Sequence, residues 1–212
     1  MRANSQPRRD LAKTAVGRRL RSIEHRDVQE PAMRLVLTAA RLFNEHSIHA
    51  TGIDRIIAEA GVARMTFYKH FGSKEGLVRA VMERESKAWF EWLDAELGRP
   101  QEPRQRISAF FALLGKWFSR SDFKGCCFIN AVGERDRLDN SVRPIARAHR
   151  KATFVYIRSL LEGSALADPD QLADQLTILA DGATVTAMVT GNPRTASSAA
   201  KAALALMDAT DF

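Results

Sequence analysis

Residues 51–77 read TGIDRIIAEAGVARMTFYKHFGSKEGL, and this stretch decides the fold of the region around it. Apolar residues at helical spacing predict a first short helix over 51–60, which Thr51 can cap and Gly61 ends. A second helix is predicted over 64–71. Two short helices joined by a glycine-containing turn form the helix-turn-helix geometry, in which the second helix enters the major groove of DNA.

The second predicted helix buries Phe67 and turns its other side chains outward. The residues expected to face outward are Arg64, Met65, Thr66, Tyr68, Lys69 and His70. Arginine is the commonest reader of guanine, and the Met65 and Thr66 side chains can meet a thymine methyl group. Tyrosine, lysine and histidine side chains reach phosphates. We therefore expect the first three to read bases and the last three to contact phosphates. The alternative is that they form only the solvated face of a packed helix.

Helical patterns continue on both sides of this stretch. Pro31 can occupy the first position of an amphipathic helix whose apolar residues are Leu35, Val36, Ala39, Ala40, Leu42 and Phe43. Ser73 can cap a long helix over 74–97, which Gly98, Pro100 and Pro103 terminate. Further helices are predicted over 107–118, 141–162, 169–190 and 195–207. The apolar run 126–132 has no partner strand and is also predicted to be helical, so we expect an all-α fold.

Composition excludes several classes of protein. With 212 residues, 45% hydrophobic and 27% charged, the chain is typical of a globular protein, and no apolar run is long enough to span a bilayer. The first residues contain no apolar stretch that would serve as a signal-peptide core, so we expect a cytoplasmic protein without a membrane partner. Phosphate-binding glycine loops, nucleophile elbows and zinc-binding His-Glu-x-x-His motifs are missing. We therefore expect no enzyme, catalytic residue, cofactor or metal.

The formal net charge of +7 is concentrated near the start of the chain. Residues 1–26 contain eight basic residues and only Asp10 and Glu24 as acidic ones. One interpretation is a solvated, disordered leader, and the other is an arm that follows the DNA backbone. We treat residues 1–29 as a basic, flexible N-terminal extension.

The stretch 51–77 closely resembles the DNA-binding signature of TetR/AcrR-family regulators. The segments GCCFINA (125–131) and LADGA (179–183) resemble segments in one branch of that family. The resemblance implies a homodimer of all-helical subunits that binds double-stranded operator DNA and is released by a small-molecule effector. It also implies that Arg64 and Met65 read bases and that four residues contact phosphates, namely Thr51, Tyr68, His70 and Lys74.

This resemblance divides the chain into three parts. The helix-turn-helix DNA-binding domain covers residues 30–73. A helical ligand-binding and dimerisation domain covers 74–212, in which 74–97 is the linking helix. The expected function is that of a transcriptional repressor, released from a palindromic operator by a small, largely apolar molecule. A rival hypothesis is a DNA-bound adaptor that recruits another protein and holds no ligand.

Aromatic residues are concentrated after the first domain, where all three tryptophans lie. Core packing is one explanation, and a hollow lined by aromatic residues with a few orienting polar groups is the other. The candidate pocket residues are Trp89, Trp92, Phe111, Phe128, Asn130, His149 and Asp181.

Small residues recur at helical spacing in the last two predicted helices. They are Ala180, Ala183 and Ala187 in the first, and Ala199 and Ala203 in the second. Two such faces from each subunit could form a two-fold, four-helix interface that matches a palindromic operator. The alternative is packing within one chain.

Two smaller patterns also have two interpretations. The neighbouring Cys126 and Cys127 suggest either structural packing or a redox switch. His46 and His49 have a spacing found in metal sites but no further ligands beside them, which favours a surface role.

Overall fold

The computed structural model describes residues 30–98, 102–134 and 142–210, and every regular element in these ranges is an α-helix. The predicted all-α fold is confirmed. The helices are α2 (Pro31–His46), α3 (Ile53–Ala60), α4 (Arg64–Phe71), α5 (Lys74–Leu97), α6 (Pro103–Phe118), α7 (Cys127–Glu134), α8 (Arg143–Leu160), α9 (Pro169–Thr190) and α10 (Thr195–Thr210). The expected extension 1–29 lies outside the described residues. None of the described helices is long and apolar enough to cross a membrane.

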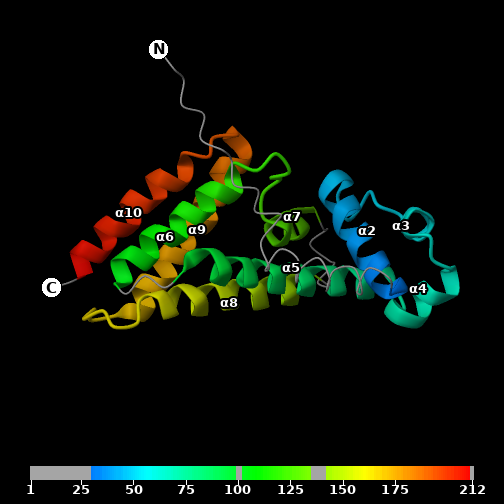
Figure 1. Ribbon diagram of the computed structural model, residues 1–212, viewed down its shortest axis with the longest axis horizontal. Coiled ribbons are helices and arrows are strands. Elements are labelled where there is room, and N and C mark those ends of the chain that lie inside the picture. The colour runs from blue at the N-terminus through cyan, green and yellow to red at the C-terminus, as the bar shows by residue number, and fades with distance from the viewer. Residues whose placement is uncertain (1–29, 99–101, 135–141, 211–212) are drawn as a thin grey trace, which may run out of the picture.

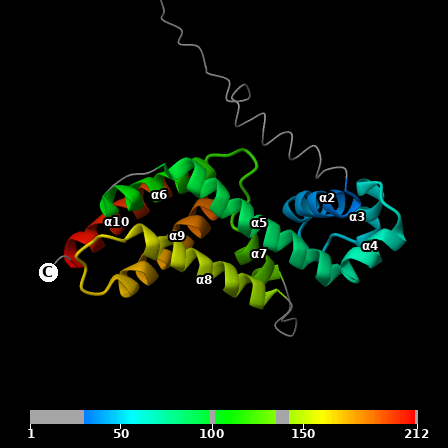
Figure 2. The same ribbon diagram turned by 60° about the horizontal axis from the view of Figure 1, so that its bottom comes forward.

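Helix α5 connects the two ends of the molecule (Figure 1). The head, which we define as α2, α3 and α4, packs at its N-terminal end. Helices α6, α9 and α10 lie at the other end, and α8 runs alongside α5 in both views (Figures 1 and 2). We call α6, α8, α9 and α10 the bundle. The 24 residues of α5 give it a length of about 36 Å.

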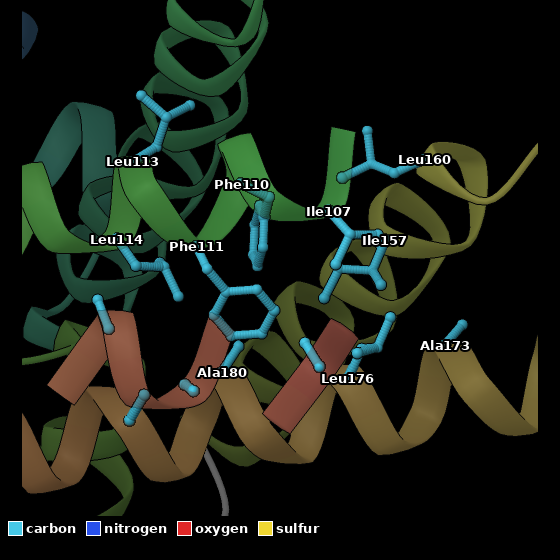
Figure 3. Close-up of a cluster of buried hydrophobic side chains, with 14 of the residues drawn as sticks. Ile107, Phe110, Phe111, Leu113, Leu114, Ile157, Leu160, Ala173, Leu176 and Ala180 are labelled. Atoms are coloured by element: carbon cyan, nitrogen blue, oxygen red, sulfur yellow. The ribbon is translucent and has the colours of Figure 1, made fainter. Parts of the chain in front are cut away.

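The hydrophobic core consists of three clusters. The head cluster includes Leu35, Leu42, Ile56 and Phe67. The bundle cluster includes Phe110, Phe111, Ile157 and Leu176, which meet between α6, α8 and α9 (Figure 3). The junction cluster lies between them and consists of Ile48, Val78, Met82, Phe128, Ala131 and Val142. It joins the loop after α2 to α5, α7 and the start of α8.

Most helix ends agree with the sequence signals. Ser73 caps α5, because its Oγ accepts the Gly76 N–H at 3.2 Å. Gly61 ends α3 in the left-handed conformation, with φ 60°. The predicted cap at Thr51 is wrong: α3 begins after Gly52, and the Thr51 hydroxyl instead donates to the Ser47 carbonyl at 2.7 Å. The run after Cys126 is helical, as predicted.

Arg34 of α2 fixes the turn of the helix-turn-helix. Its Nε and Nη2 atoms donate to the Ala60 carbonyl at 3.0 and 2.7 Å, and Nη2 also donates to the carbonyl of Gly61. Carbonyls at the end of a helix have no partner within the helix. One guanidinium therefore satisfies the end of α3 and ties the turn before α4 to the first helix of the head.

We expect Arg34→Ala to destabilise the protein by about 1.5–3 kcal/mol, because hydrogen bonds from a charged donor are lost and two carbonyls lose their partner. Urea unfolding followed by circular dichroism measures this loss. Arg55→Ala is the matched control, since exposed Arg55 pairs with Glu59 of its own helix and such pairs contribute about 0.3–0.5 kcal/mol. Equal losses for the two variants would contradict a specific role for Arg34.

Candidate DNA-binding surface and ligand cavity

Helix α4 has an exposed polar face, and its opposite face packs on the head cluster. Phe67 is fully buried in the head cluster, and the neighbouring Tyr68 ring lies edge-on to it at 5.1 Å between centroids. Met65 is 78% exposed and Tyr68 is 41% exposed. Arg64, Lys69 and His70 are exposed and Thr66 is half-buried. Except for Thr66, the α4 side chains predicted to contact DNA therefore project from the surface of this helix.

Arg64 is held by α3 in the free protein. Its guanidinium forms an ion pair with Asp54, and the Arg64 and Asp54 side chains are 58% and 75% exposed. An exposed pair of this kind contributes little to stability. It does fix the direction of the Arg64 side chain, and Arg64 must leave Asp54 to pair with a base.

Two predicted phosphate contacts lie away from the exposed face of α4. Lys74 is half-buried at the start of α5, and its Nζ donates to the His49 carbonyl at 3.4 Å. Thr51 is 0% exposed. Because neither the backbone nor the hydroxyl of Thr51 reaches the surface, we remove this residue from the proposed contacts.

A cavity of about 860 Å³ lies beside α5, and it is lined by residues of α2, α6, α7, α8 and α9 as well. Of the predicted pocket residues, Trp89, Trp92, Phe128, Asn130, His149 and Asp181 line it. Phe111 does not, because its ring is fully buried and points from α6 towards Ala180 of α9 (Figure 3). Its neighbour Phe110 lines the cavity instead.

Some lining residues could not be assigned from sequence. Phe43 and Asn44 come from the head, so the cavity reaches the first helix of the DNA-binding part of the chain. Trp117 and Phe123 were visible only as members of the aromatic-rich region. No local pattern links these residues to α5, because their neighbourhood arises from tertiary packing.

Aromatic rings form one wall of the cavity. The Trp89 ring lies 5.2 Å from Trp92 and 4.8 Å from Trp117, measured between centroids. Phe123 stands edge-on to Trp117 at 4.9 Å. These tilted and edge-on arrangements are favourable for aromatic pairs. They give the cavity a large apolar surface.

Two polar side chains in the cavity wall, His149 and Asp181, are held in place by neighbouring residues. The His149 ring stacks on Phe128 at 3.7 Å, and its Nδ1 lies 2.9 Å from the Ser86 Oγ. Burial lowers the pKa of His149 to about 4, so the ring is neutral at pH 7. Burial raises the pKa of Asp181, while Arg150 at 2.9 Å opposes that shift.

A direct contact joins α7 to the head. The Ile48 N–H, in the loop after α2, donates to Glu134 Oε2 at 2.8 Å. Phe128 and Asn130 of the same short helix line the cavity. Helix α7 therefore touches both the cavity and the head.

Two family models match the chain. The model described as bacterial regulatory proteins, tetR family, matches residues 35–81, and the model described as tetracyclin repressor-like, C-terminal domain, matches residues 103–203. The chain belongs to the TetR family. The sequence resemblance is thus confirmed.

Individual relatives agree with this assignment. The transcriptional activator FasR of Mycolicibacterium smegmatis is 33% identical over 107 residues, which are 50% of this chain and 48% of FasR. The transcriptional repressor ComR of Escherichia coli is 28% identical over 92 residues, 43% of this chain and 44% of ComR. The chain thus spans about half the length of the curated relatives it matches. These relatives are TetR-type transcriptional regulators and not enzymes.

A solved TetR-family regulator from Streptomyces coelicolor is similar over nearly its whole length. It is 27% identical, with a TM-score of 0.75, and the match covers 87% of this chain and 98% of that protein. The arrangement of head, linking helix and bundle is therefore that of a TetR subunit.

The five alanines predicted for the dimer interface pack within the TetR subunit. Ala180, Ala183, Ala187, Ala199 and Ala203 are all at most 6% exposed and belong to the bundle cluster. Small side chains let α10 approach closely, since a Cβ on Gly115 of α6 would lie 3.3 Å from the Ala196 Cβ. The outward face of α9 instead carries Ile178, Val185, Met188 and Val189.

The surroundings of the two cysteines and of the exposed histidine pair do not indicate a redox or metal site. Cys126 and Cys127 are free thiols, and burial raises the pKa of Cys126, which disfavours the reactive thiolate. His46 and His49 are exposed. Within the described ranges, no group of three or more His, Cys, Asp or Glu side chains is arranged to hold a metal ion.

Burial of His149 should make the protein sensitive to acid. Its pKa is about 4 in the folded chain and ordinarily 6.5, so between these values the unfolded chain binds a proton that the folded chain does not. Stability is therefore lost as pH falls through this window. We expect His149→Phe to reduce that loss by on the order of 2 kcal/mol, a value discounted for partial exposure.

Urea unfolding at several pH values across this window measures the effect. The control His49→Phe removes an exposed histidine, leaves His149 in place and should retain the acid response. An identical pH dependence for native protein and His149→Phe would contradict the role of burial.

Proposed function

We propose that the chain is a ligand-responsive transcriptional repressor that binds a palindromic operator as a homodimer and is released when a small, largely apolar molecule occupies the cavity. The observation that carries this proposal is the position of α5. Two residues separate its start from the end of α4, and Trp89 and Trp92 near its other end line the cavity. A ligand that shifts this helix displaces the recognition surface.

The exposed face of α4 supports operator binding. Arg64 and Met65 project from its first turn, where a recognition helix contacts base edges. Lys69 and His70 follow on the exposed part of the same helix, in positions suited to phosphates. The matched relatives include an activator and a repressor. We choose repression because the resemblance to the family implies it.

The outward face of α9 supports dimerisation. Ile178 is 57% exposed, Val189 is 75% exposed, and Val185 and Met188 lie between them. A contiguous exposed apolar patch of this kind marks an interaction surface. A two-fold dimer would place two copies of α4 on one side of the molecule, and successive major grooves on one face of DNA are roughly 34–36 Å apart.

The junction cluster supports coupling between cavity and head. Phe128 belongs to this cluster and also lines the cavity, while Ile48 belongs to it and is bonded to Glu134. A ligand that moves α7 must therefore either carry Ile48 along or break that hydrogen bond. The cavity volume of about 860 Å³ lies within the range of about 300–1,000 Å³ that is usual for ligand sites. This volume favours the sensor hypothesis over the adaptor hypothesis.

Loss of a base-reading residue should change the preferred DNA sequence, whereas loss of a phosphate-contacting residue should lower affinity for every sequence. We expect Arg64→Ala to change the sequence selected from a random DNA pool, since a bidentate contact to guanine contributes about 1–3 kcal/mol of discrimination. Lys69→Ala should weaken binding to all sequences alike and reduce the logarithmic salt slope by about 0.9 per half-site. An unchanged selected consensus for Arg64→Ala would refute its role as a base reader.

Effector and operator should weaken each other's binding by the same factor. Molecules that raise the melting temperature in a metabolite screen would be titrated by calorimetry with and without the selected operator. We expect the affinities to differ by about 5- to 150-fold, the usual range of coupling between sites. Glu134→Gln, which weakens the bond to Ile48, should reduce this factor. Equal affinities in both states of the native protein would rule out the mechanism.

A further inference from the structure

All but one of the charged side chains that line the cavity have a partner among the described residues. Asp181 pairs with Arg150 at 2.9 Å, Asp122 with Arg120 at 2.7 Å and Glu85 with Arg84 at 2.9 Å. Glu45 pairs with Arg41, and Glu134 accepts the Ile48 N–H. Lys124 remains, and it is exposed. A charged ligand would lose part of its hydration on entering and, apart from exposed Lys124, would find the charges of the lining already paired, which is unfavourable.

The apolar wall suits a flat ring. Trp89 contacts Trp92 and Trp117 on one side, and His149 stacks on Phe128 elsewhere in the wall, with 5° between the two ring planes. All five residues line the cavity. Aromatic ligands gain stacking and edge-on contacts with such rings in addition to burying apolar area.

His149 supplies a single directed hydrogen bond. The Ser86 hydroxyl contacts Nδ1 at 2.9 Å and has no other side-chain partner among the described residues. We therefore assign the Ser86 hydroxyl as the donor and Nδ1 as the acceptor. In a neutral imidazole this places the ring proton on Nε2. Nε2 has no partner in the described part of the chain, and the ring lines the cavity. The imidazole thus offers an N–H donor to whatever enters.

We propose that the effector is an uncharged, planar aromatic molecule with a hydrogen-bond acceptor, such as an aryl ketone, which lies against the tryptophan wall and accepts from His149 Nε2. This assignment rests on the proposed function, because it takes the cavity to be the sensor site. Asp181 takes no part in recognition, since Arg150 holds it.

Four naphthalene derivatives of similar shape test the chemical class. They are 2-acetylnaphthalene, 2-ethylnaphthalene, 2-naphthoate and 2-naphthylmethylammonium, each titrated into the full chain by calorimetry near neutral pH. The ketone should bind about 2- to 10-fold more tightly than the hydrocarbon, the usual worth of one hydrogen bond. Both ions should bind at least about 10-fold more weakly than the ketone, because each would lose hydration in a cavity whose charges, apart from exposed Lys124, are already paired.

Two variants test the residues. His149→Phe keeps a ring on Phe128 and removes the donor, so the ketone should lose its advantage over the hydrocarbon. Arg150→Gln leaves the Asp181 carboxylate unpaired, so affinity for the ammonium probe should rise at least about 10-fold. The matched control is Arg158→Gln on the same helix. Arg158 pairs with Asp170 and does not line the cavity. Its affinities for all four probes should remain native.

Each result distinguishes this proposal from the proposed function. Tighter binding of either ion than of the ketone by the native chain would overturn the class and leave the sensor role standing. A ketone advantage that survives in His149→Phe would overturn the role of the imidazole. If none of the four probes binds, the effector class and the sensor cavity both fail, whereas operator selection with the head remains a separate measurement. Ketone binding that leaves operator affinity unchanged would support the class and refute the coupling.

Discussion

The structure depends on one constraint: α5 contributes side chains to all three hydrophobic clusters. Leu77 and Val81 belong to the head cluster, Val78 and Met82 to the junction cluster and Leu93 to the bundle cluster. Protein interiors are packed as closely as organic crystals, so a helix shared between cores cannot move in one of them without moving in the others. The 24-residue helix also has no proline, and glycine only at Gly76 in its first turn, so no sequence feature favours a bend between the cavity and the head. A displacement at Trp89 is therefore transmitted along α5 and not absorbed within it.

The junction cluster is the part of this arrangement that a ligand can most easily repack. It is the smallest of the three clusters, and one hydrogen bond, from Ile48 to Glu134, accompanies its apolar contacts. Coupling between sites usually amounts to about 1–3 kcal/mol. Burial of a single side chain of the size of Met or Phe contributes about 1.5–3 kcal/mol. Partial loss of one contact, such as that of Phe128, would thus be enough to produce the proposed effect on operator binding while the head and bundle clusters stay intact.

The sequence was enough to predict the helices, and it was not enough to predict which way individual side chains point. Helices α4, α5 and α9 have the predicted limits, and Ser73 at the start of α5 shows why: a capping side chain is a local signal that acts on the backbone beside it. The pocket residue Phe111 was wrong by one position, since adjacent helical residues point about 100° apart and only the neighbouring helices decide which faces the cavity. The exposure of Thr51 and of the five alanines is likewise decided by tertiary packing, which buries them within one chain, and the dimer interface itself stays a prediction. A run of small residues at helical spacing indicates close packing, and it does not say whether the neighbour is α6 of the same subunit or another copy of the chain.

The two sites use different physical forces, and that difference explains how a weak mechanical link can control a regulator. The proposed contacts of Lys69 and His70 with phosphates would release counterions, so operator affinity would fall steeply as salt rises. The proposed effector would bind in the cavity through apolar area and one hydrogen bond, which salt hardly affects. At physiological salt the DNA complex has already lost much of its electrostatic affinity. A further change of about 1–3 kcal/mol, delivered through α5 and α7, would then lower operator affinity by about 5- to 150-fold, whereas the same change would leave a much tighter complex largely bound.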